Sequence, residues 1–234
     1  MPSVSIVIAA HNEVDSIGDV FDRCRAVLAR CVDDAEIVMV DDGSTDGTGE
    51  KMDRIRDRHP DLVRVIRHHR NMGIAHTFEA AYRAGTKEYV LDIPADGEYP
   101  PEVLESMVPL LGSYDIIIAE RAQKSYGPYR RLVSGCYRWL PRLMFGVDLR
   151  DPGSVKCRRR EVIHGVRPAS RGVFAEAERT IRAIRKGYRL GVVEIKPERR
   201  VAGSGGGAAP GLVLQAGIDM LTLWVRLSLL RRPP

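Results

Sequence analysis

Apolar runs of strand length alternate with helix-patterned segments through the first hundred residues of the chain. The strand-like runs cover residues 3–10, 36–40, 62–66 and 89–93. Between them, a helix is predicted from Asp15 or Ser16 to about Arg30, and further helical segments at residues 49–59 and 74–84. This alternation predicts an α/β fold with a largely parallel, doubly wound sheet and helices on both faces.

A cluster of polar residues follows each of these four strand-like runs. The clusters occupy residues 11–13, 41–42, 71–73 and 96–98. The carboxyl ends of parallel strands meet at one edge of a sheet, and the ligands of open α/β sheets bind at that edge. The four segments are therefore expected to form one binding site.

The segment at residues 88–102, EYVLDIPADGEYPPE, carries two carboxylates just after a buried strand. Mg²⁺ and Mn²⁺ prefer oxygen ligands, and Mg²⁺ commonly takes one or two carboxylates together with phosphate oxygens. Asp96 and Glu98 are therefore candidate metal ligands. The alternative interpretation is an ordinary polar turn before the next helix.

Two common nucleotide-binding motifs are absent from the expected places. The turn after the first strand reads AAHNE, so it is not the GxGxxG of a dinucleotide site, and the chain contains no GxxxxGK[ST] phosphate loop. Residues 203–208 fit GxGxxA superficially, but they lie late in the chain and are interpreted as a flexible loop. Carboxylates that accept hydrogen bonds from a base and a ribose, together with a metal ion for a diphosphate, describe a sugar-nucleotide pocket.

The overall charge and the cysteines exclude several other classes of protein. The net charge of +5 and the pI of about 9.1 favour an anionic partner, but aromatic residues make up only 6% of the chain, which argues against nucleic-acid binding. The cysteines form no metal-binding pattern and are expected to be reduced thiols. We expect no signal peptide and no membrane-spanning segment, and hence a cytoplasmic protein that can lie at the membrane periphery.

Several segments together resemble the family 2 glycosyltransferases with the GT-A fold. The segments are SIVIAAHNE, VDDGSTDGT, NMGIAHTFEAAYRAG, LDIPADGEYPPE and, further on, GVFAEAERTIRAIRKGYRLGVVEI. The resemblance covers about residues 3–204 and is closest to dolichol-phosphate mannose synthase and the polyprenyl-phosphate glycosyltransferases. It divides the chain into a GT-A domain at residues 1–204 and a glycine-rich linker with an apolar C-terminal helix at residues 205–234.

The resemblance assigns roles to individual residues. The nucleotide is expected to contact Ala9, His11, Asn12, Glu13, Asp41, Asp42, Asn71 and Gly73. Asp96 and Glu98 are expected to hold Mg²⁺ or Mn²⁺. Phosphate groups of donor and acceptor are expected to face Arg121, Arg130, Ser134 and Arg200, because arginine pairs bidentately with phosphate oxygens. The catalytic residues implied are Asp96, Arg121 and Glu178.

Some positions depart from the pattern of the family. Pro94 replaces the first aspartate of the metal loop, while Glu98 replaces a glutamine and restores a carboxylate. The usual Pro and Tyr near the start of the chain are Ala9 and His11. After Arg200, glycines at residues 205–206 replace the usual Ser-Lys pair, which removes a phosphate-binding lysine of the family pattern.

The resemblance implies an inverting, metal-dependent transfer of a sugar from UDP- or GDP-sugar to an acceptor. A lipid phosphate is already ionised and needs no base, whereas a hydroxyl acceptor needs a carboxylate to take its proton. The candidates for that base are Glu176, Glu178 and, more weakly, Asp151. Two alternatives stay open: a soluble hydroxyl acceptor, and a catalytically silent scaffold that binds nucleotides, which Pro94 suggests.

The C-terminal segment and a few other residues are interpreted separately. Residues 211–230 are apolar except for one polar stripe, so residues 211–232 are expected to lie on a membrane surface, pack on the domain or form a homodimer contact. The run of arginines at residues 158–160 is interpreted as a solvated helix face, and His68 as a surface residue. Trp139 and Trp224 are interpreted as packing residues or interface anchors.

Overall fold

The structure is a computed structural model. It describes residues 2–122, 128–170, 172–198 and 209–229. The strands are β1 (Val4–Ala10), β2 (Ala35–Asp41), β3 (Val63–Arg67), β4 (Tyr89–Pro94), β5 (Ile116–Arg121), β6 (Lys156–Arg159) and β7 (Leu190–Ile195). The helices are α1 (Ile17–Cys31), α2 (Thr48–Arg58), α3 (Ile74–Ala84), α4 (Val103–Met107), the 3₁₀ turn Val108–Leu110, α5 (Pro128–Phe145), α6 (Arg160–Gly165), α7 (Ala175–Arg185) and α8 (Pro210–Trp224).

The strands of the described residues form a single sheet in the order β3-β2-β1-β4-β6-β5-β7. Strands β1 to β4 are parallel, and β5 pairs in parallel with β7. Strand β6 is antiparallel to both of its neighbours, β4 and β5. The predicted α/β fold with a largely parallel sheet is therefore confirmed.

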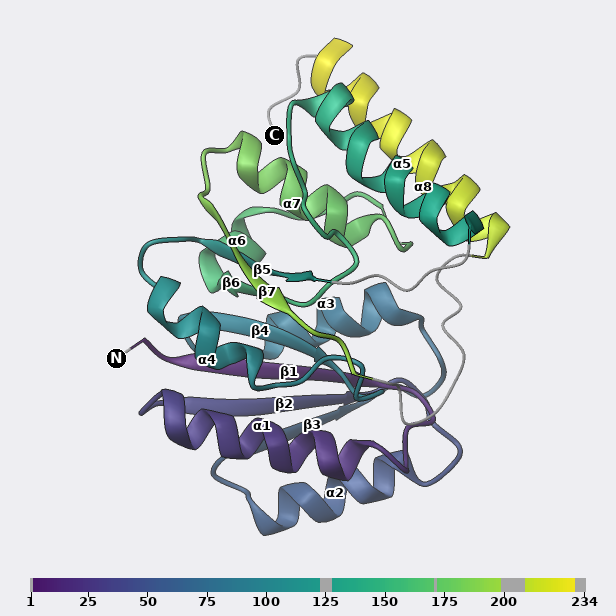
Figure 1. Cartoon of the computed structure of the whole chain (residues 1–234). Coiled ribbons are helices and arrows are strands. Elements are labelled where there is room, and N and C mark those ends of the chain that lie inside the picture. Colours follow the sequence, from purple (N-terminus) through teal and green to yellow (C-terminus); the bar gives the residue numbers. More distant parts are fainter. Residues whose placement is uncertain (1, 123–127, 171, 199–208, 230–234) are drawn as a thin grey trace.

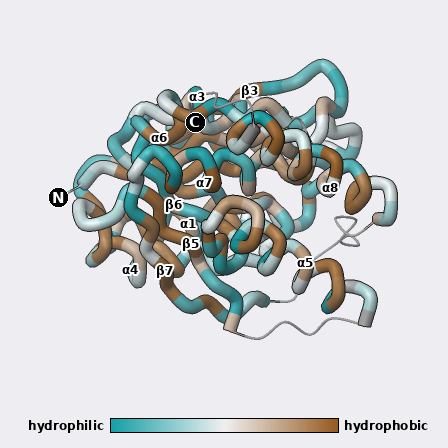
Figure 2. Tube along the Cα trace, turned by 90° about the horizontal axis from the view of Figure 1, so that it is seen from above, coloured by the Kyte–Doolittle hydropathy of each residue, from teal (hydrophilic) through white to brown (hydrophobic). Residues whose placement is uncertain are grey.

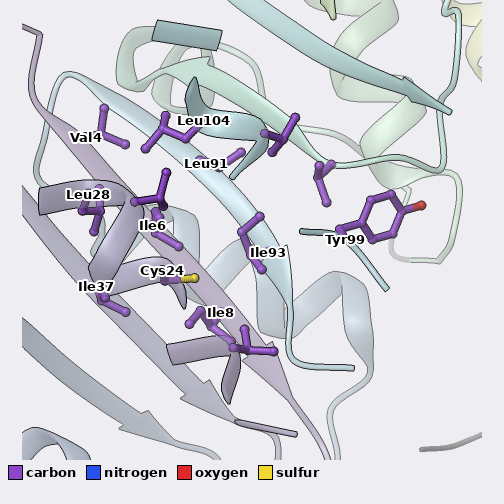
Figure 3. Packing of buried hydrophobic residues seen from close by; sticks show 14 of the residues in the cluster. Val4, Ile6, Ile8, Cys24, Leu28, Ile37, Leu91, Ile93, Tyr99 and Leu104 are labelled. Atoms are coloured by element: carbon purple, nitrogen blue, oxygen red, sulfur yellow. The ribbon is translucent and has the colours of Figure 1, made fainter. Parts of the chain in front are cut away.

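Both faces of the sheet are covered, as predicted (Figure 1). On one face, Ile6 and Ile8 of β1 pack with the apolar sides of α1 and α4, and the close view in Figure 3 shows Cys24 and Leu28 of α1 against these residues. On the other face, Val7 of β1 packs with residues of α3 and α6. Strand β1 is buried over its whole length because it carries apolar side chains toward both layers.

Helices α5, α7 and α8 form a further layer, in which α5 and α8 lie side by side (Figure 1). Their shared core includes Phe145 of α5, Ile181 of α7 and Phe174, which directly precedes α7. Met220 and Leu223 of α8 complete it. The predicted C-terminal helix is thus present, and it continues beyond Trp224 as a π-helical stretch over Val225–Leu229. The predicted linker at residues 205–208 lies outside the described residues.

Candidate functional site

The loops that follow β1, β2, β3 and β4 begin at the same edge of the sheet. Ala10 of β1 is in register with Asp41 of β2, which in turn is in register with Arg67 of β3. On the other side, Ala9 is in register with Pro94 of β4. The parallel pairing therefore brings the four polar clusters of the sequence to one edge.

Asp42 joins the loops after β2 and β3. Its Oδ1 lies 2.7 Å from His68 Nδ1 and accepts a hydrogen bond of 2.9 Å from the Met72 amide, while Oδ2 accepts one of 2.9 Å from the Gly73 amide. Burial alone would raise the pKa of Asp42, but these hydrogen bonds outweigh burial and lower it. Asp42 is therefore held as a carboxylate that supports the loop. The prediction that His68 is a surface residue is wrong, since its side chain is only 12% exposed.

Asn12 and Asp41 shape the loop after β2. Asn12 donates its amide to Ser44 Oγ at 2.9 Å, and its Oδ1 accepts the Thr45 amide at 2.9 Å. Asp41 Oδ1 accepts the Ser44 amide at 3.0 Å. Asn12 has a positive φ of 56°, a conformation that asparagine tolerates better than most residues. These two side chains thus fix the path of the backbone beside the proposed nucleotide.

Two glycines are required by the backbone of these loops. Gly43 has a φ of +68°, and a Cβ there would lie 2.5 Å from the carbonyl carbon of Arg70. Gly73 has a φ of +87°, which allows its amide to point at Asp42. The close approach at Gly43 packs the loop after β2 directly against the loop after β3.

The other nucleotide candidates occupy different surroundings. Ala9 is 4% exposed and packs in the apolar cluster of β2 and α3, so its side chain belongs to the core. His11 Nδ1 lies 2.9 Å from the carbonyl oxygen of Asp42. Glu13 is bound through its amide to Thr48 Oγ1 at 2.8 Å, and Ser16 Oγ donates to Glu13 Oε2 at 3.0 Å. His11 and Glu13 therefore lie beside the loop that Asn12 and Asp41 shape.

The candidate metal loop follows β4. Asp96 Oδ1 accepts the Glu98 amide at 3.0 Å, and this hydrogen bond closes a tight turn that carries both carboxylates. Glu98 Oε1 lies 3.7 Å from Arg121 Nη1. The part of the chain that the structure describes contains no group of three or more His, Cys, Asp or Glu side chains able to hold a metal ion. Two carboxylates fit Mg²⁺ or Mn²⁺ only if a ligand such as a diphosphate supplies further oxygens.

Arg121 lies at the end of β5, where its guanidinium pairs bidentately with Asp151. The two hydrogen bonds, from Nε and Nη2, are both 2.8 Å long. The guanidinium also lies 5.8 Å from the ring centroid of Tyr99, whose hydroxyl donates to the Gly153 carbonyl at 3.1 Å. Arg121 is thus oriented beside Glu98 by a buried carboxylate, an arrangement that the sequence did not reveal because Asp151 comes thirty residues later.

Glu178 has an environment that disfavours a role as a general base. Its carboxylate accepts the amides of Ala169 and Ser170 at 3.0 and 2.8 Å, and Arg182 Nε at 2.7 Å. Burial would raise its pKa, but these hydrogen bonds outweigh burial and lower it. A carboxylate with this many donors is a poor proton acceptor, so Glu178 acts here by holding residues 169–170 against α7.

The prediction that residues 158–160 form a solvated helix face is wrong for Arg158 and Arg159, whereas Arg160 is exposed and begins helix α6. Arg158 lies on strand β6, is fully buried and donates from Nη1 to Asp92 Oδ1 of β4 at 2.8 Å. Its Nη2 bonds Glu176, the other candidate base, and its guanidinium lies 5.2 Å from the ring centroid of Tyr82. Strand alternation places Lys156 and Arg158 on one side of β6, but the run of arginines has no local feature that reveals this burial.

The remaining phosphate-binding candidates do not lie in the loops described so far. Ser134 is on helix α5, which packs against α8. Arg130 is on the same helix, but its side chain is outside the described part of the structure, as is all of Arg200. Asn71 accepts the Gly73 amide through Oδ1 at 2.9 Å, so it supports the loop.

Comparison with known proteins gives the family of the chain. Residues 5–167 match the family model described as glycosyl transferase family 2. A dolichol-phosphate mannosyltransferase of Pyrococcus furiosus is 29% identical over 172 residues, which is 70% of this chain and 48% of that protein. An undecaprenyl-phosphate mannosyltransferase of Micrococcus luteus is 25% identical over 233 residues, which is 94% of this chain and 93% of that protein. The chain spans about half the length of several other curated relatives, as it does of the Pyrococcus protein.

Solved structures share the fold. Glucosyl-3-phosphoglycerate synthase of Mycobacterium tuberculosis, in complex with Mn²⁺, UDP and phosphoglyceric acid, aligns with a TM-score of 0.74 at 18% identity, over 95% of this chain and 78% of that one. A mannosyltransferase of Pyrobaculum calidifontis, in complex with GDP-mannose and Mn²⁺, aligns with a TM-score of 0.66 at 20% identity, over 96% of this chain and 64% of that one. With the family model matched over residues 5–167, the chain belongs to glycosyl transferase family 2.

Proposed function

We propose that this chain transfers a sugar from a nucleoside-diphosphate sugar to a polyprenyl phosphate, with inversion at the sugar and with the help of Mg²⁺ or Mn²⁺. The named activity of the Micrococcus relative, which matches over nearly the whole chain, supports a polyprenyl-phosphate acceptor. The active site would then lie close to a membrane. UDP and GDP-mannose in the similar solved structures support a sugar-nucleotide donor.

The donor would lie across the edge of the sheet. His11, Glu13 and Asp41 would contact the base and the ribose. At Gly73, the absence of a side chain would let the backbone approach the nucleotide closely. Asp96 and Glu98 would hold the cation, which when bound neutralises the charge that develops on the leaving diphosphate. Arg121 lies beside Glu98 and adds a fixed positive charge at the same edge.

One observation favours a phosphate acceptor over a hydroxyl acceptor. The three carboxylates considered as bases are all engaged by arginines: Asp151 by Arg121, Glu176 by Arg158 and Glu178 by Arg182. For Glu176, burial would raise the pKa, but the charges of Arg158 and Arg179 outweigh burial and lower it. An ionised lipid phosphate needs no proton acceptor, so these paired carboxylates do not impede its attack.

A thermal-shift panel of UDP-, GDP- and dTDP-sugars, each with and without Mn²⁺, tests the donor site. We expect one base to raise the unfolding midpoint in a metal-dependent manner, because a ligand that binds only the folded state stabilises it. Asp96→Ala should abolish the metal-dependent part of the shift, whereas the matched variant Asp61→Ala, at an exposed position after α2, should retain it.

The transfer reaction is then followed with a radiolabelled sugar nucleotide and either undecaprenyl phosphate or a panel of soluble hydroxyl acceptors. Product on the lipid phosphate, with the configuration of the anomeric carbon inverted, supports the proposal. Product only on a soluble hydroxyl acceptor refutes the acceptor assignment. Nucleotide binding without transfer to any acceptor refutes catalysis and favours a nucleotide-binding scaffold.

A further inference from the structure

Helix α5 carries an apolar stripe that the rest of the described chain does not cover. The stripe follows the spacing of three and four residues that places side chains on one face of a helix. Leu143, Leu132 and Trp139 are 84%, 67% and 63% exposed, respectively. The stripe consists of Tyr129, Leu132, Cys136, Trp139, Leu140 and Leu143. The opposite side of α5 packs on the core of the α5–α7–α8 layer.

Helix α8 carries a second exposed apolar stripe. Leu214, Ile218 and Leu221 are 67%, 51% and 56% exposed and lie four and three residues apart. The buried side of α8, which includes Met220 and Leu223, faces the shared core. In the view of Figure 2, hydrophobic stretches run along both helices at the margin of the molecule. We call the two exposed stripes, with their flanking side chains, the helix-pair face.

The charges of the helix-pair face are almost all positive. Helix α5 has arginines but no aspartate or glutamate in its sequence PYRRLVSGCYRWLPRLMF. Arg131, Arg138 and Arg142 are exposed, and the guanidinium of Arg142 lies 5.6 Å from the Trp139 ring centroid. Between residues 210 and 229 the acidic side chain is Asp219, which accepts a hydrogen bond of 2.9 Å from Gln215, while Arg226 is exposed in the stretch Val225–Leu229.

We propose that the helix-pair face binds an anionic phospholipid surface, with α5 and α8 lying in the plane of the membrane. An exposed apolar stripe bordered by arginine and tryptophan is the pattern of helices that insert into the boundary between headgroups and acyl chains. Within the described residues no helix is long and apolar enough to cross a bilayer, so these helices lie along the surface. The docking is independent of the nucleotide site, although it would bring that site to a lipid-borne acceptor.

A second copy of the chain fits this face less well. In a two-fold symmetric dimer the same patch meets itself. The exposed arginines of α5 would then meet the arginines of the partner without acidic side chains on that helix to neutralise them. Anionic lipid headgroups supply the missing negative charge. Each arginine near such a surface contributes about 1 kcal/mol to the free energy of binding, or about fivefold in affinity.

Co-sedimentation with lipid vesicles tests the proposal without any substrate. The wild-type chain should bind vesicles of phosphatidylcholine and phosphatidylglycerol and bind phosphatidylcholine vesicles at least tenfold more weakly. Leu143→Glu should weaken the binding by about tenfold or more, because a leucine that enters the membrane is replaced by a charge. Arg138→Glu/Arg142→Glu should weaken it by more than about 25-fold, from the two arginine contributions lost.

The control has the same change of charge at another place. Arg54→Glu/Arg58→Glu alters two exposed arginines of α2. If the helix-pair face binds the membrane, the affinity of this variant for vesicles should stay within about twofold of the wild type. In a Trp224→Phe background, Trp139 is the remaining tryptophan. Its emission should shift to shorter wavelength with anionic vesicles and be quenched by lipids brominated on the acyl chains.

Three results would overturn the proposal. The first is equal binding of anionic and neutral vesicles or no binding to either. The second is an equal loss in the two double-arginine variants, which would show a dependence on net charge alone. The third is a stable dimer by light scattering that Leu143→Glu converts to monomer while vesicle binding is absent, which would assign the face to a second copy. Because these assays contain no donor or acceptor, a failure of the proposed transfer reaction would leave their outcome unchanged.

Discussion

The buried arginine of β6 allows a sharp test of what stabilises the centre of the sheet. Arg158 has no exposed side-chain surface and is paired with Asp92, whose side chain is 9% exposed. Arg158→Met keeps most of the length of the side chain but removes the charge. Asp92 then lacks its arginine in a buried place, where burial already raises its pKa.

The expected loss follows from the cost of breaking a buried ion pair. Removal of one partner leaves an uncompensated buried charge and typically costs about 3–5 kcal/mol. For a chain of this size, that loss corresponds to a decrease of about 10 °C in the unfolding midpoint. Asp92 can limit the cost by taking up a proton. Because its pKa is raised in the folded state, the loss should be smaller at pH 5 than at pH 8.

Urea denaturation followed by circular dichroism measures the effect. The double variant Arg158→Met/Asp92→Asn should recover part of the lost free energy of unfolding, because the unpaired charge is gone. Arg159→Met is the matched control on the same strand: its side chain is 28% exposed and its Nε donates to Tyr89 Oη at 2.9 Å, so about 1 kcal/mol should be lost. A loss below about 1 kcal/mol in Arg158→Met, or equal losses in the two single variants, would refute the reasoning.

Other variants test the loops and the sheet. Gly43→Ala should lower the free energy of unfolding by about 2 kcal/mol or more by urea denaturation, since the positive φ and the contact with the Arg70 backbone both oppose a Cβ. Asp42→Asn should weaken nucleotide binding about tenfold by calorimetry. The lowered pKa of Asp42 stabilises the wild-type fold above the usual carboxyl range, and this contribution is lost as the pH falls. The free energy of unfolding of Asp42→Asn should therefore decrease less than that of the wild type as the pH is lowered. Burial lowers the pKa of Lys156 to about 8, so the unfolded chain binds more protons above that pH and wild-type stability should rise between pH 8 and 10 relative to Lys156→Met.

The elements of the first half of the chain could be predicted closely because local pattern decides them. The helix predicted at residues 74–84 matches α3, and the strand predicted at residues 3–10 differs from β1 by one residue. Apolar residues alternate or recur with the right period there, and glycine or polar residues end each element. The convergence of the four polar clusters followed from parallel pairing alone.

The second half resisted prediction because its contacts join distant segments. Arg158 and Asp92 are 66 residues apart, and they meet only because β6 inserts antiparallel between β4 and β5. A run of arginines has no local feature that distinguishes a buried strand from a solvated helix. In the same way, the role of Glu178 depends on the amides of residues 169–170, and that of Arg121 on Asp151.

The alternation of β4 explains where the charge of the candidate metal loop can lie. Asp92 and Pro94 share a face with Val90, which packs toward α3, and Asp92 cannot turn to the sheet edge without removing one of the two carboxylates that pair with the buried Arg158. Pro94 has neither a carboxylate nor an amide hydrogen, and the Ala95 amide bonds the Ala9 carbonyl at 3.2 Å. The carboxylates beyond the strand are Asp96 and Glu98, so a cation there depends on phosphate oxygens for the rest of its ligands. Mn²⁺ should therefore bind weakly alone and at least tenfold more tightly with a nucleoside diphosphate, and calorimetry that shows equal affinity in both cases would contradict this account.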